Sequence, residues 1–352
     1  MAEALSLEST ALLPETWSQL EPRSSFRIYN PAITRFRGNL LMAYRVDSGR
    51  RESMQRRIGL CHLDEDLAVV PGSVQPLSDT IQGGDPRRYD PRFLVYGDRL
   101  FIHYNNNFMT RPNQICLVEL DPDSLEARSP ARPLHLEGAP RQELEKNWML
   151  FEHEGEILAV YQIAPHTLLR VNLEGRDLVA CTPLYTTAWD VSAYAGRYGL
   201  PRGGAPPVRR GDVYVAFFHS RWQSTRWQWL LRHWPVPSGA KLPRYVAAVE
   251  RRLRRPFARV RYYGGAYAFA ATPPFRPVWL APEPLLRPED EAPYRYRRRV
   301  NPYADGIVYP CGAVPWGDGN WLVSYGVNDE SCCLRVVGGY GTKICQNWQS
   351  VL

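Results

Sequence analysis

The stretch from Asp90 to Asn105, which reads DPRFLVYGDRLFIHYN, contains the elements that decide the fold. Two apolar runs, 93–96 and 99–104, are separated by the pair Gly97-Asp98. Short apolar runs rich in aromatic and branched residues favour strands, and a Gly-Asp pair between them is typical of a tight turn. The stretch therefore predicts a β-hairpin that begins at a polar residue followed by proline.

The same pattern occurs five times along the chain. The other four copies read NPAITRFRGNLLMAYR (30–45), NWMLFEHEGEILAVYQ (147–162), GAPPVRRGDVYVAFFHS (204–220) and PCGAVPWGDGNWLVSYG (310–326). The aromatic residue near the end of the second strand recurs after 60, 57, 57 and 107 residues, at Tyr44, Tyr104, Tyr161, Phe218 and Tyr325. The last interval equals one period plus about 50 extra residues.

A repeat of this length built from hairpins indicates the blades of a β-propeller. We therefore predict an all-β protein, a five-bladed β-propeller over residues 26–352, preceded by an N-terminal extension over residues 1–25. The first strand of each blade lines the central channel of a propeller. One pocket is thus expected to collect Asn30, Asp90, Asn147, Gly204 and the region of Tyr309. The alternative is five unrelated hairpins in a β-sandwich, which the nearly constant spacing disfavours.

The extra residues form a basic insertion over about residues 221–262. Between Arg221 and Arg261 the chain has eleven Lys or Arg and one Glu, whereas the net charge of the whole chain is +7. Within this insertion, residues 242–253 place apolar side chains at helical spacing. The pattern predicts a helix that either packs on the propeller with a solvated basic face, or contacts an anionic membrane surface or a phosphate-bearing acceptor. Nucleic acid is not expected as a partner, because no recognised nucleic-acid fold accompanies the basic segment.

Several classes of protein are disfavoured by composition. The sequence has no apolar run of about 18 residues that would predict a transmembrane helix. Residues 1–13 lack the basic start and the continuous apolar run of a signal peptide. The seven cysteines have no regular spacing, so reduced thiols and a cytoplasmic location are expected. Cys332 and Cys333 are adjacent, which is poor geometry for zinc, and no metal site is expected.

Taken in order, the five motifs resemble those of glycoside hydrolase family 130. The matching elements span about residues 26–334 and are N-P-A-I with a strand ending Y-R, D-P-R followed by G-D, K-N-x-x-L-F, G-G-A-P-P-V with a strand ending F-H, and V-Y-P-C-G with Y-G-V-N-D. That family comprises β-mannoside phosphorylases and β-1,2-mannosidases with a five-bladed propeller fold. The resemblance implies an inverting enzyme that cleaves or forms β-mannosidic bonds in an oligosaccharide or sugar phosphate by phosphorolysis. Inorganic phosphate would be the co-substrate, and no other cofactor is implied.

The resemblance also implies roles for individual residues. It makes Asp90 the general acid, in preference to Asp85 in a second D-P-R sequence, because Asp90 is followed by the strand-turn-strand pattern. In the family this aspartate is thought to pass its proton through the 3-hydroxyl of the sugar, and general-acid help of this kind is worth about 10²–10⁴ in rate. The other implied roles are phosphate binding by Lys146, His219, Arg92 and Arg111, and sugar binding by Asn30, Arg45, Asn147, Trp148, Tyr309 and Asp329. For Trp148 a packed position in the core is an equal alternative.

Other activities stay open at this point. Tyr89 stands where the family usually has Glu before D-P-R, and the basic insertion has no counterpart there. An inverting hydrolase would need a second carboxylate to activate water, for which Asp85, Glu145 and Asp329 are candidates. A glycosyltransferase would use a sugar donor in place of phosphate, and a non-catalytic glycan-binding propeller is a further alternative. Propellers that use three catalytic carboxylates are disfavoured, because the first motif has Asn30 in place of Asp.

Overall fold

The computed structural model describes residues 4–20, 22, 25–49, 54–106, 113–141, 145–225, 258–291 and 306–338. Regular structure within these residues is mainly β-strand, so the prediction of an all-β protein is confirmed. The described helices are short: α1 (Glu15–Ser18), α2 (Leu77–Thr80), α3 (Ser192–Tyr198) and the 3-10 helix η2 (Pro288–Asp290). The helix expected over 242–253 and the candidate Arg111 lie outside the described residues.

The strands form five consecutive antiparallel units. The first two units contain β2 (Arg27–Phe36), β3 (Asn39–Ser48) and β4 (Gln55–Leu63), then β5 (Tyr89–Tyr96), β6 (Arg99–Asn106), β7 (Gln114–Leu120) and β8 (Arg132–Leu136). The third and fourth contain β9 (Met149–His153), β10 (Glu156–Gln162), β11 (His166–Asn172) and β12 (Val179–Thr187), then β13 (Leu200–Arg210), β14 (Val213–Thr225), β15 (Ala258–Ala270) and β16 (Pro277–Leu280). The fifth contains β17 (Val308–Trp316), β18 (Asn320–Val327) and β19 (Ser331–Val337).

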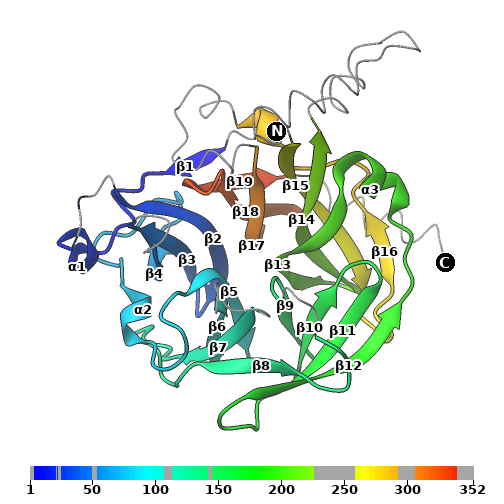
Figure 1. Ribbon diagram of the computed structural model, residues 1–352, viewed down its shortest axis with the longest axis horizontal. Coiled ribbons are helices and arrows are strands. Elements are labelled where there is room, and N and C mark those ends of the chain that lie inside the picture. Colours follow the sequence, from blue (N-terminus) through cyan, green and yellow to red (C-terminus); the bar gives the residue numbers. More distant parts are fainter. Residues whose placement is uncertain are drawn as a thin grey trace, which may run out of the picture.

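The five units surround a common axis. Their first strands, β2, β5, β9, β13 and β17, contact one another in a closed ring, and Figure 1 shows these strands nearest the centre of the molecule. The second and third units are joined into one eight-stranded sheet, because β8 and β12 pair in parallel. Each predicted hairpin is present as the first two strands of a unit.

The N-terminal segment takes part in this arrangement. Strand β1 (Leu5–Leu7), within the residues expected to form an extension, pairs with β19 and becomes the fourth strand of the last unit. Trp17 in α1 is buried, and its indole nitrogen donates a hydrogen bond to Asp79 at 2.9 Å. Residues from the two ends of the described chain therefore meet in one sheet, which closes the ring of units.

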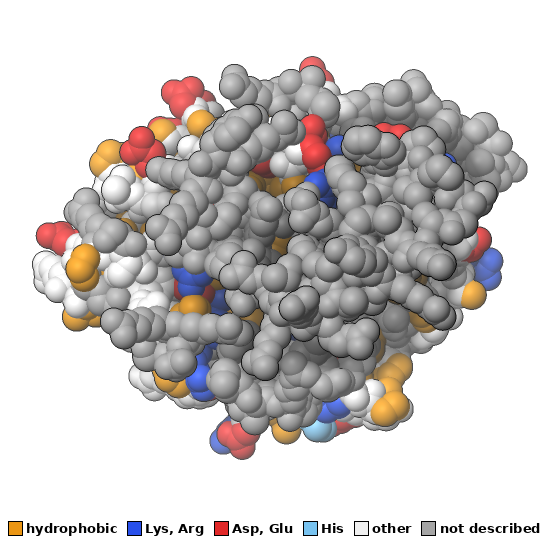
Figure 2. All heavy atoms as spheres, turned by 45° about the horizontal axis from the view of Figure 1, so that its top comes forward, with side chains coloured by type: hydrophobic (Ala, Val, Ile, Leu, Met, Phe, Trp, Pro, Cys, Tyr) orange, Lys and Arg blue, Asp and Glu red, His pale blue; other side chains and the backbone are white. Residues whose placement is uncertain are grey.

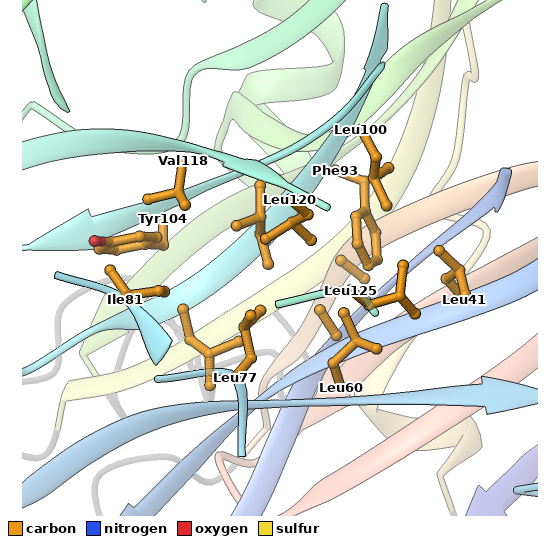
Figure 3. Close-up of a cluster of buried hydrophobic side chains, with 14 of the residues drawn as sticks. Leu41, Leu60, Leu77, Ile81, Phe93, Leu100, Tyr104, Val118, Leu120 and Leu125 are labelled. Carbon is orange, nitrogen blue, oxygen red and sulfur yellow. The ribbon is translucent and has the colours of Figure 1, made fainter. Parts of the chain in front are cut away.

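Apolar side chains fill the spaces between neighbouring units. The described residues form five buried clusters, one between each pair of consecutive units. Figure 3 shows one of them, in which Leu41 and Leu60 of the first unit lie near Phe93 and Leu100 of the second. Because complete burial of such a side chain contributes about 1.5–3 kcal/mol, these clusters hold the units together.

The repeated aromatic residue has a structural explanation in these clusters. Tyr44 lies opposite Gly59 on β4, and Phe218 lies opposite Gly265 on β15. A Cβ atom at Gly59 would lie 2.5 Å from the Tyr44 ring, and one at Gly265 would lie 2.4 Å from the Phe218 ring. These two rings thus lie over a glycine of the next strand, whereas Tyr104 and Tyr325 lie opposite Cys116 and Cys333.

The two ends of the predicted insertion are strands. Residues 221–225 continue β14, and residues 258–262 begin β15, with regular antiparallel pairing from Arg221–Tyr262 to Thr225–Ala258. The first and last residues of the expected insertion, about 221–262, therefore extend the hairpin beyond the repeat motif. On the face shown in Figure 2, Lys and Arg side chains lie near Asp and Glu side chains on the described surface. No helix in the described part of the chain has the length and apolar character needed to cross a membrane.

Candidate active site

The inner strands carry irregularities where the motif residues were predicted to converge. Pairing between β2 and β3 shifts register between Tyr29 and Ala32, and pairing between β5 and β6 shifts between Tyr89 and Arg92. Bulges of this kind redirect side chains and are common next to active sites. The bulged residues Asn30 and Asp90 have φ values of 53° and 55°, a left-handed conformation that Asn and Asp adopt more readily than most residues. The proline that follows each of them lacks an N–H group and therefore suits a bulge.

Asp90 lies at the centre of a set of hydrogen-bond donors. Its Oδ1 accepts bonds from Asn30 Nδ2 at 2.8 Å and Arg45 Nη1 at 3.2 Å, and Asn105 Nδ2 lies 3.5 Å from Oδ2. Burial would raise the pKa of the carboxyl, but the charge of Arg45 and the bond from Asn30 outweigh burial. With more distant help from two other cations, the pKa of Asp90 lies below its ordinary value. The site therefore holds Asp90 as a carboxylate in the free protein.

Arg45 is fixed from behind by Asp47, two residues further along β3. Its Nε and Nη2 each donate to a different Asp47 oxygen at 2.7 Å, which leaves Nη1 for Asp90. The guanidinium group lies 4.6 Å from the ring centre of Tyr29, whose hydroxyl also donates to Asp47 at 2.8 Å. Paired donors and a stacked ring restrict the orientation of an arginine. Asp47 thus orients the cation that contacts Asp90.

Tyr309 and Asn147 join two other units at this site. Asn147 also has a left-handed backbone, with a φ of 65°, and its Oδ1 accepts a 2.7 Å bond from the Tyr309 hydroxyl. Arg92 lies behind them, where it is 3% exposed and donates to the carbonyl oxygens of Gly204 and Pro91, both at 2.7 Å. Its guanidinium group lies 5.2 Å from the centre of the Tyr309 ring. These contacts make Arg92 a supporting cation below the surface of the site.

A cationic group lies on the side of the site formed by β13, β14 and β15. Arg202 is opposite His219 across β13 and β14, so both side chains lie on one face, and Arg221 follows on that face two residues later. Lys146, Arg202 and Arg221 are exposed and make no ion pair with any described residue. The pKa of Lys146 is lowered by partial burial and, against the opposing charge of Asp90, by Arg202, Arg45 and Arg221. Three cations therefore share this region of the site.

His219 is buried beside these cations. Burial lowers its pKa to about 3, and the charges of Lys146, Arg202 and Arg92 act in the same direction, against a hydrogen bond to Gly203. The ring stacks on Tyr262 with centres 5.3 Å apart and meets the edge of Tyr309 at 4.6 Å. The histidine is therefore a neutral ring at ordinary pH.

The three candidates for a second carboxylate differ in their surroundings. Asp85 is held by its neighbour Arg87, whose Nε donates to Oδ1 at 2.9 Å and whose Nη2 donates to Oδ2 at 2.5 Å. Glu145 accepts bonds from Trp148 Nε1 at 3.2 Å and from the Tyr161 hydroxyl at 3.1 Å. Asp329 lies in a turn after β18, where burial raises its pKa, Arg45 lowers it and Asp90 raises it. Asp329 is therefore the candidate that interacts with the Asp90 site.

Trp148 occupies a packed position. It is 3% exposed, belongs to the cluster between the second and third units, and meets Tyr161 edge-on with ring centres 5.2 Å apart. It also borders a small recess lined by Asp90, Arg92, His103, Asn105 and Asn147. This position corresponds to the alternative of core packing, with the indole supporting the wall of the site.

Two larger cavities lie away from these residues. One, of about 570 Å³, is lined by Arg35, His62 and Trp316, among others. The other, of about 290 Å³, lies further along the same five inner strands and is lined by residues such as Thr34, Glu152 and Pro315. Neither contains a residue predicted for catalysis or binding, so the chemistry concentrates at Asp90 although the cavity there is smaller.

Sequence reasoning missed several residues of the site. These are Asp47, Asn105, Arg202, Arg221 and Tyr262. Asp47 and Asn105 had a signal, because Asp47 is two residues after Arg45 on one face of a strand and Asn105 ends the hairpin that starts at Asp90. Arg202 had none, and Arg221 was noted only as the first residue of the basic insertion, since their relation to His219 follows only from the strand register.

Comparison with known proteins supports the arrangement. No protein-family model and no curated protein sequence matches the chain. Among solved structures, a β-1,2-mannobiose phosphorylase from Listeria innocua matches with a TM-score of 0.58 at 14% identity, over 96% of this chain and 97% of that chain. The fold resembles that of mannoside phosphorylases.

Two other structures support the same conclusion. A GDP-Man-dependent mannosyltransferase from Leishmania mexicana matches with a TM-score of 0.58 at 12% identity, covering 96% of this chain and 89% of that chain. A third match is a structure from the GH130 family of mannoside phosphorylases, which contains hydrolases that target β-1,2-mannosidic linkages in Candida mannan. It matches with a TM-score of 0.55 at 16% identity, over 89% of this chain and 84% of that chain. The resemblance to glycoside hydrolase family 130 is confirmed at the level of the fold.

Proposed function

We propose that the chain is an enzyme of β-mannoside metabolism, a phosphorylase built on a five-bladed propeller whose blades are the five antiparallel units. The observation that carries the proposal is the position of Asp90, held by Arg45 and Asn30 on one side of a site whose other side carries Lys146 and Arg202. A carboxylate that exchanges a proton and cations that hold phosphate are the two elements that phosphorolysis needs.

In the proposed reaction, phosphate and a β-mannoside exchange groups with inversion at the anomeric carbon. For phosphorolysis Asp90 first takes up a proton from solvent, and it then supplies this proton to the leaving oxygen while a phosphate oxygen attacks from the opposite face. In the direction of synthesis, Asp90 accepts the proton of the incoming hydroxyl group. The donors around Asp90 favour its carboxylate form, so the free protein is prepared for the base role in synthesis.

The sugar would lie between these two sides. Asn30, Arg45, Asn147, Tyr309 and Asp329 are the proposed contacts for its hydroxyl groups, and Lys146, Arg202 and His219 the proposed contacts for phosphate. Arg92 is proposed to act indirectly, because its Nε and Nη1 donate to carbonyl oxygens of the chain. Inorganic phosphate is the proposed co-substrate, and oligosaccharide or sugar phosphate the proposed partner.

A second candidate function is mannosyl transfer from another anionic donor. Arg221 adds a further unpaired cation, among the described residues, next to Arg202 and His219, which favours a donor whose leaving group is larger than phosphate. The mannosyltransferase that shares the fold makes this alternative concrete.

We also propose a reducing, cytoplasmic location, since the six described cysteines are buried free thiols.

The test is phosphate release from α-mannose 1-phosphate in the presence of a panel of acceptor sugars. We expect the wild type to release phosphate with one class of acceptor and Asp90→Asn to lose this activity. Asp85→Asn is the matched control, because it changes the aspartate of the other D-P-R sequence. Absence of release with every acceptor, while a different mannosyl donor is consumed, would replace the phosphorylase by the transferase.

A further inference from the structure

The hydrogen bond of His219 determines which ring nitrogen carries hydrogen. Nδ1 lies 2.8 Å from the carbonyl oxygen of Gly203, and a carbonyl oxygen only accepts hydrogen bonds. Nδ1 therefore carries the hydrogen, and in the neutral ring Nε2 has a lone pair and acts as an acceptor. No described residue donates a hydrogen bond to Nε2.

The neighbouring backbone fixes this arrangement. A Cβ atom at Gly203 would lie 1.8 Å from the carbonyl oxygen of Asn147, so only glycine allows β13 to approach the third unit this closely. The histidine ring is 3% exposed and is held between Tyr262 and Tyr309. These close contacts favour the observed orientation of the carbonyl group and of the ring.

The surrounding charges oppose a second proton on the ring. Lys146, Arg202 and Arg92 are near enough to lower the pKa of His219, and burial lowers it further. No described carboxylate pairs with the ring, since the ion pairs of Asp90 and Asp47 are with Arg45 and other arginines. The anion subsite thus combines cationic donors with one neutral acceptor.

We propose that His219 makes this subsite selective for oxyanions that carry a proton, such as hydrogen phosphate, by accepting a hydrogen bond from the P–OH group at Nε2. The inference rests on the phosphate subsite of the proposed function and specifies the form of anion that it takes. A fully deprotonated dianion of the same size has no hydrogen to donate, so its oxygen would face the lone pair of Nε2. The sugar phosphate of the reverse reaction would accordingly bind as its monoanion, because the proton stays on the phosphate throughout.

Four dianions of similar size separate this effect from charge. At slightly alkaline pH, hydrogen phosphate and hydrogen arsenate carry a proton, whereas sulfate and monofluorophosphate carry none. We expect calorimetric titration of the wild-type protein, at constant ionic strength, to show about tenfold or more tighter binding of the protonated pair, which corresponds to ~1.4 kcal/mol or more. His219→Ala should remove most of this preference, and His62→Ala, which changes a histidine outside the site, should keep it.

Each outcome decides the question. Equal binding of the four anions by the wild type, or no binding of any, would overturn the inference without need of a variant. A preference that survives in folded His219→Ala would also overturn the assignment to this residue. Selective binding without any reaction of mannose 1-phosphate would keep the inference and reject the proposed phosphorylase.

Discussion

Replacement of Asp47 by Asn tests how the positive charge behind the active site is balanced. The Asp47 side chain is 1% exposed and accepts two hydrogen bonds from Arg45 and one from Tyr29. Arg27 and Arg56 lie 3.7 Å and 3.8 Å from one of its oxygens, and both are largely buried. An amide would remove the negative charge that these three arginines share, and its NH₂ group would face a donor.

The magnitude follows from this burial. Removal of one partner from a buried ion pair costs about 3–5 kcal/mol, because the remaining charge stays in a poorly solvated position. A surface pair is worth only about 0–1 kcal/mol. We therefore expect Asp47→Asn to lower the free energy of unfolding by about 3–5 kcal/mol, a large fraction of the ~5–15 kcal/mol typical of folded proteins.

Urea unfolding followed by tryptophan fluorescence measures this change. The matched control is Glu156→Gln, which removes the charge from a pair with Arg170 in which both side chains are about half exposed. Reversibility must be verified by refolding, so that the midpoint and slope give a free energy. A loss below about 1 kcal/mol, similar to that of the control, would refute the idea that Asp47 balances the buried arginines.

Three further predictions can be tested by phosphate release or by urea unfolding. Asp90→Asn should lower phosphate release by about 10²–10⁴ while Asp85→Asn keeps the wild-type rate, and equal losses in both variants would remove Asp90 from its proposed role. Gly265→Ala should cost about 1–3 kcal/mol in unfolding free energy, because the new Cβ would overlap an aromatic ring 2.4 Å away, whereas Gly196→Ala, with nothing within 4 Å, should not destabilise. Burial raises the pKa of Asp329, so ionisation of this carboxyl opposes folding once the pH exceeds the pKa of the unfolded chain. Asp329→Asn should therefore increase the free energy of unfolding near neutral pH and have no effect in acid. A decrease in the free energy of unfolding at neutral pH would contradict this sign.

Most of the fold could be predicted because the repeat is visible in the sequence. Each copy contains both strands of a hairpin and the turn between them, so the pairing of the two strands is determined by residues that are close in sequence. The strand-closing aromatic was visible in the sequence, but its reason was not, since Gly59 and Gly265 are distant from Tyr44 and Phe218 along the chain. Strand β1 had no signal, because three residues are too few for a pattern and their partner β19 lies more than 300 residues away.

The active site was predicted less completely for a related reason. Asn30, Asp90 and Asn147 belong to the repeat and occupy equivalent places in their units, so finding one located the others. Asp47 acts through Arg45 on the same strand, and Arg202 lies beside His219 on the next strand. The importance of both residues depends on burial and register. Charge alone marked the basic insertion, so the sequence did not show that its first and last residues belong to the paired strands β14 and β15.

Charge is distributed unequally across the site, and the proposed reaction depends on this inequality. On the side of Asp90, the charge of Arg45 is balanced by Asp47 behind it and by Asp90 in front, so this side presents a carboxylate that exchanges a proton. On the other side, Lys146 and Arg202 have no ion-pair partner in the described chain, and His219 is neutral. A sugar between the two sides would have its glycosidic oxygen toward Asp90 and the opposite face of its anomeric carbon toward the bound anion, the arrangement that inversion requires. If carboxylates of the chain balanced these cations, the cations would attract the bound anion less. If Asp47 did not balance Arg45, the full positive charge of Arg45 would act on the Asp90 carboxylate and hold it more firmly in its charged form. Asp47 is therefore as necessary to the proposed mechanism as the groups that touch the substrate.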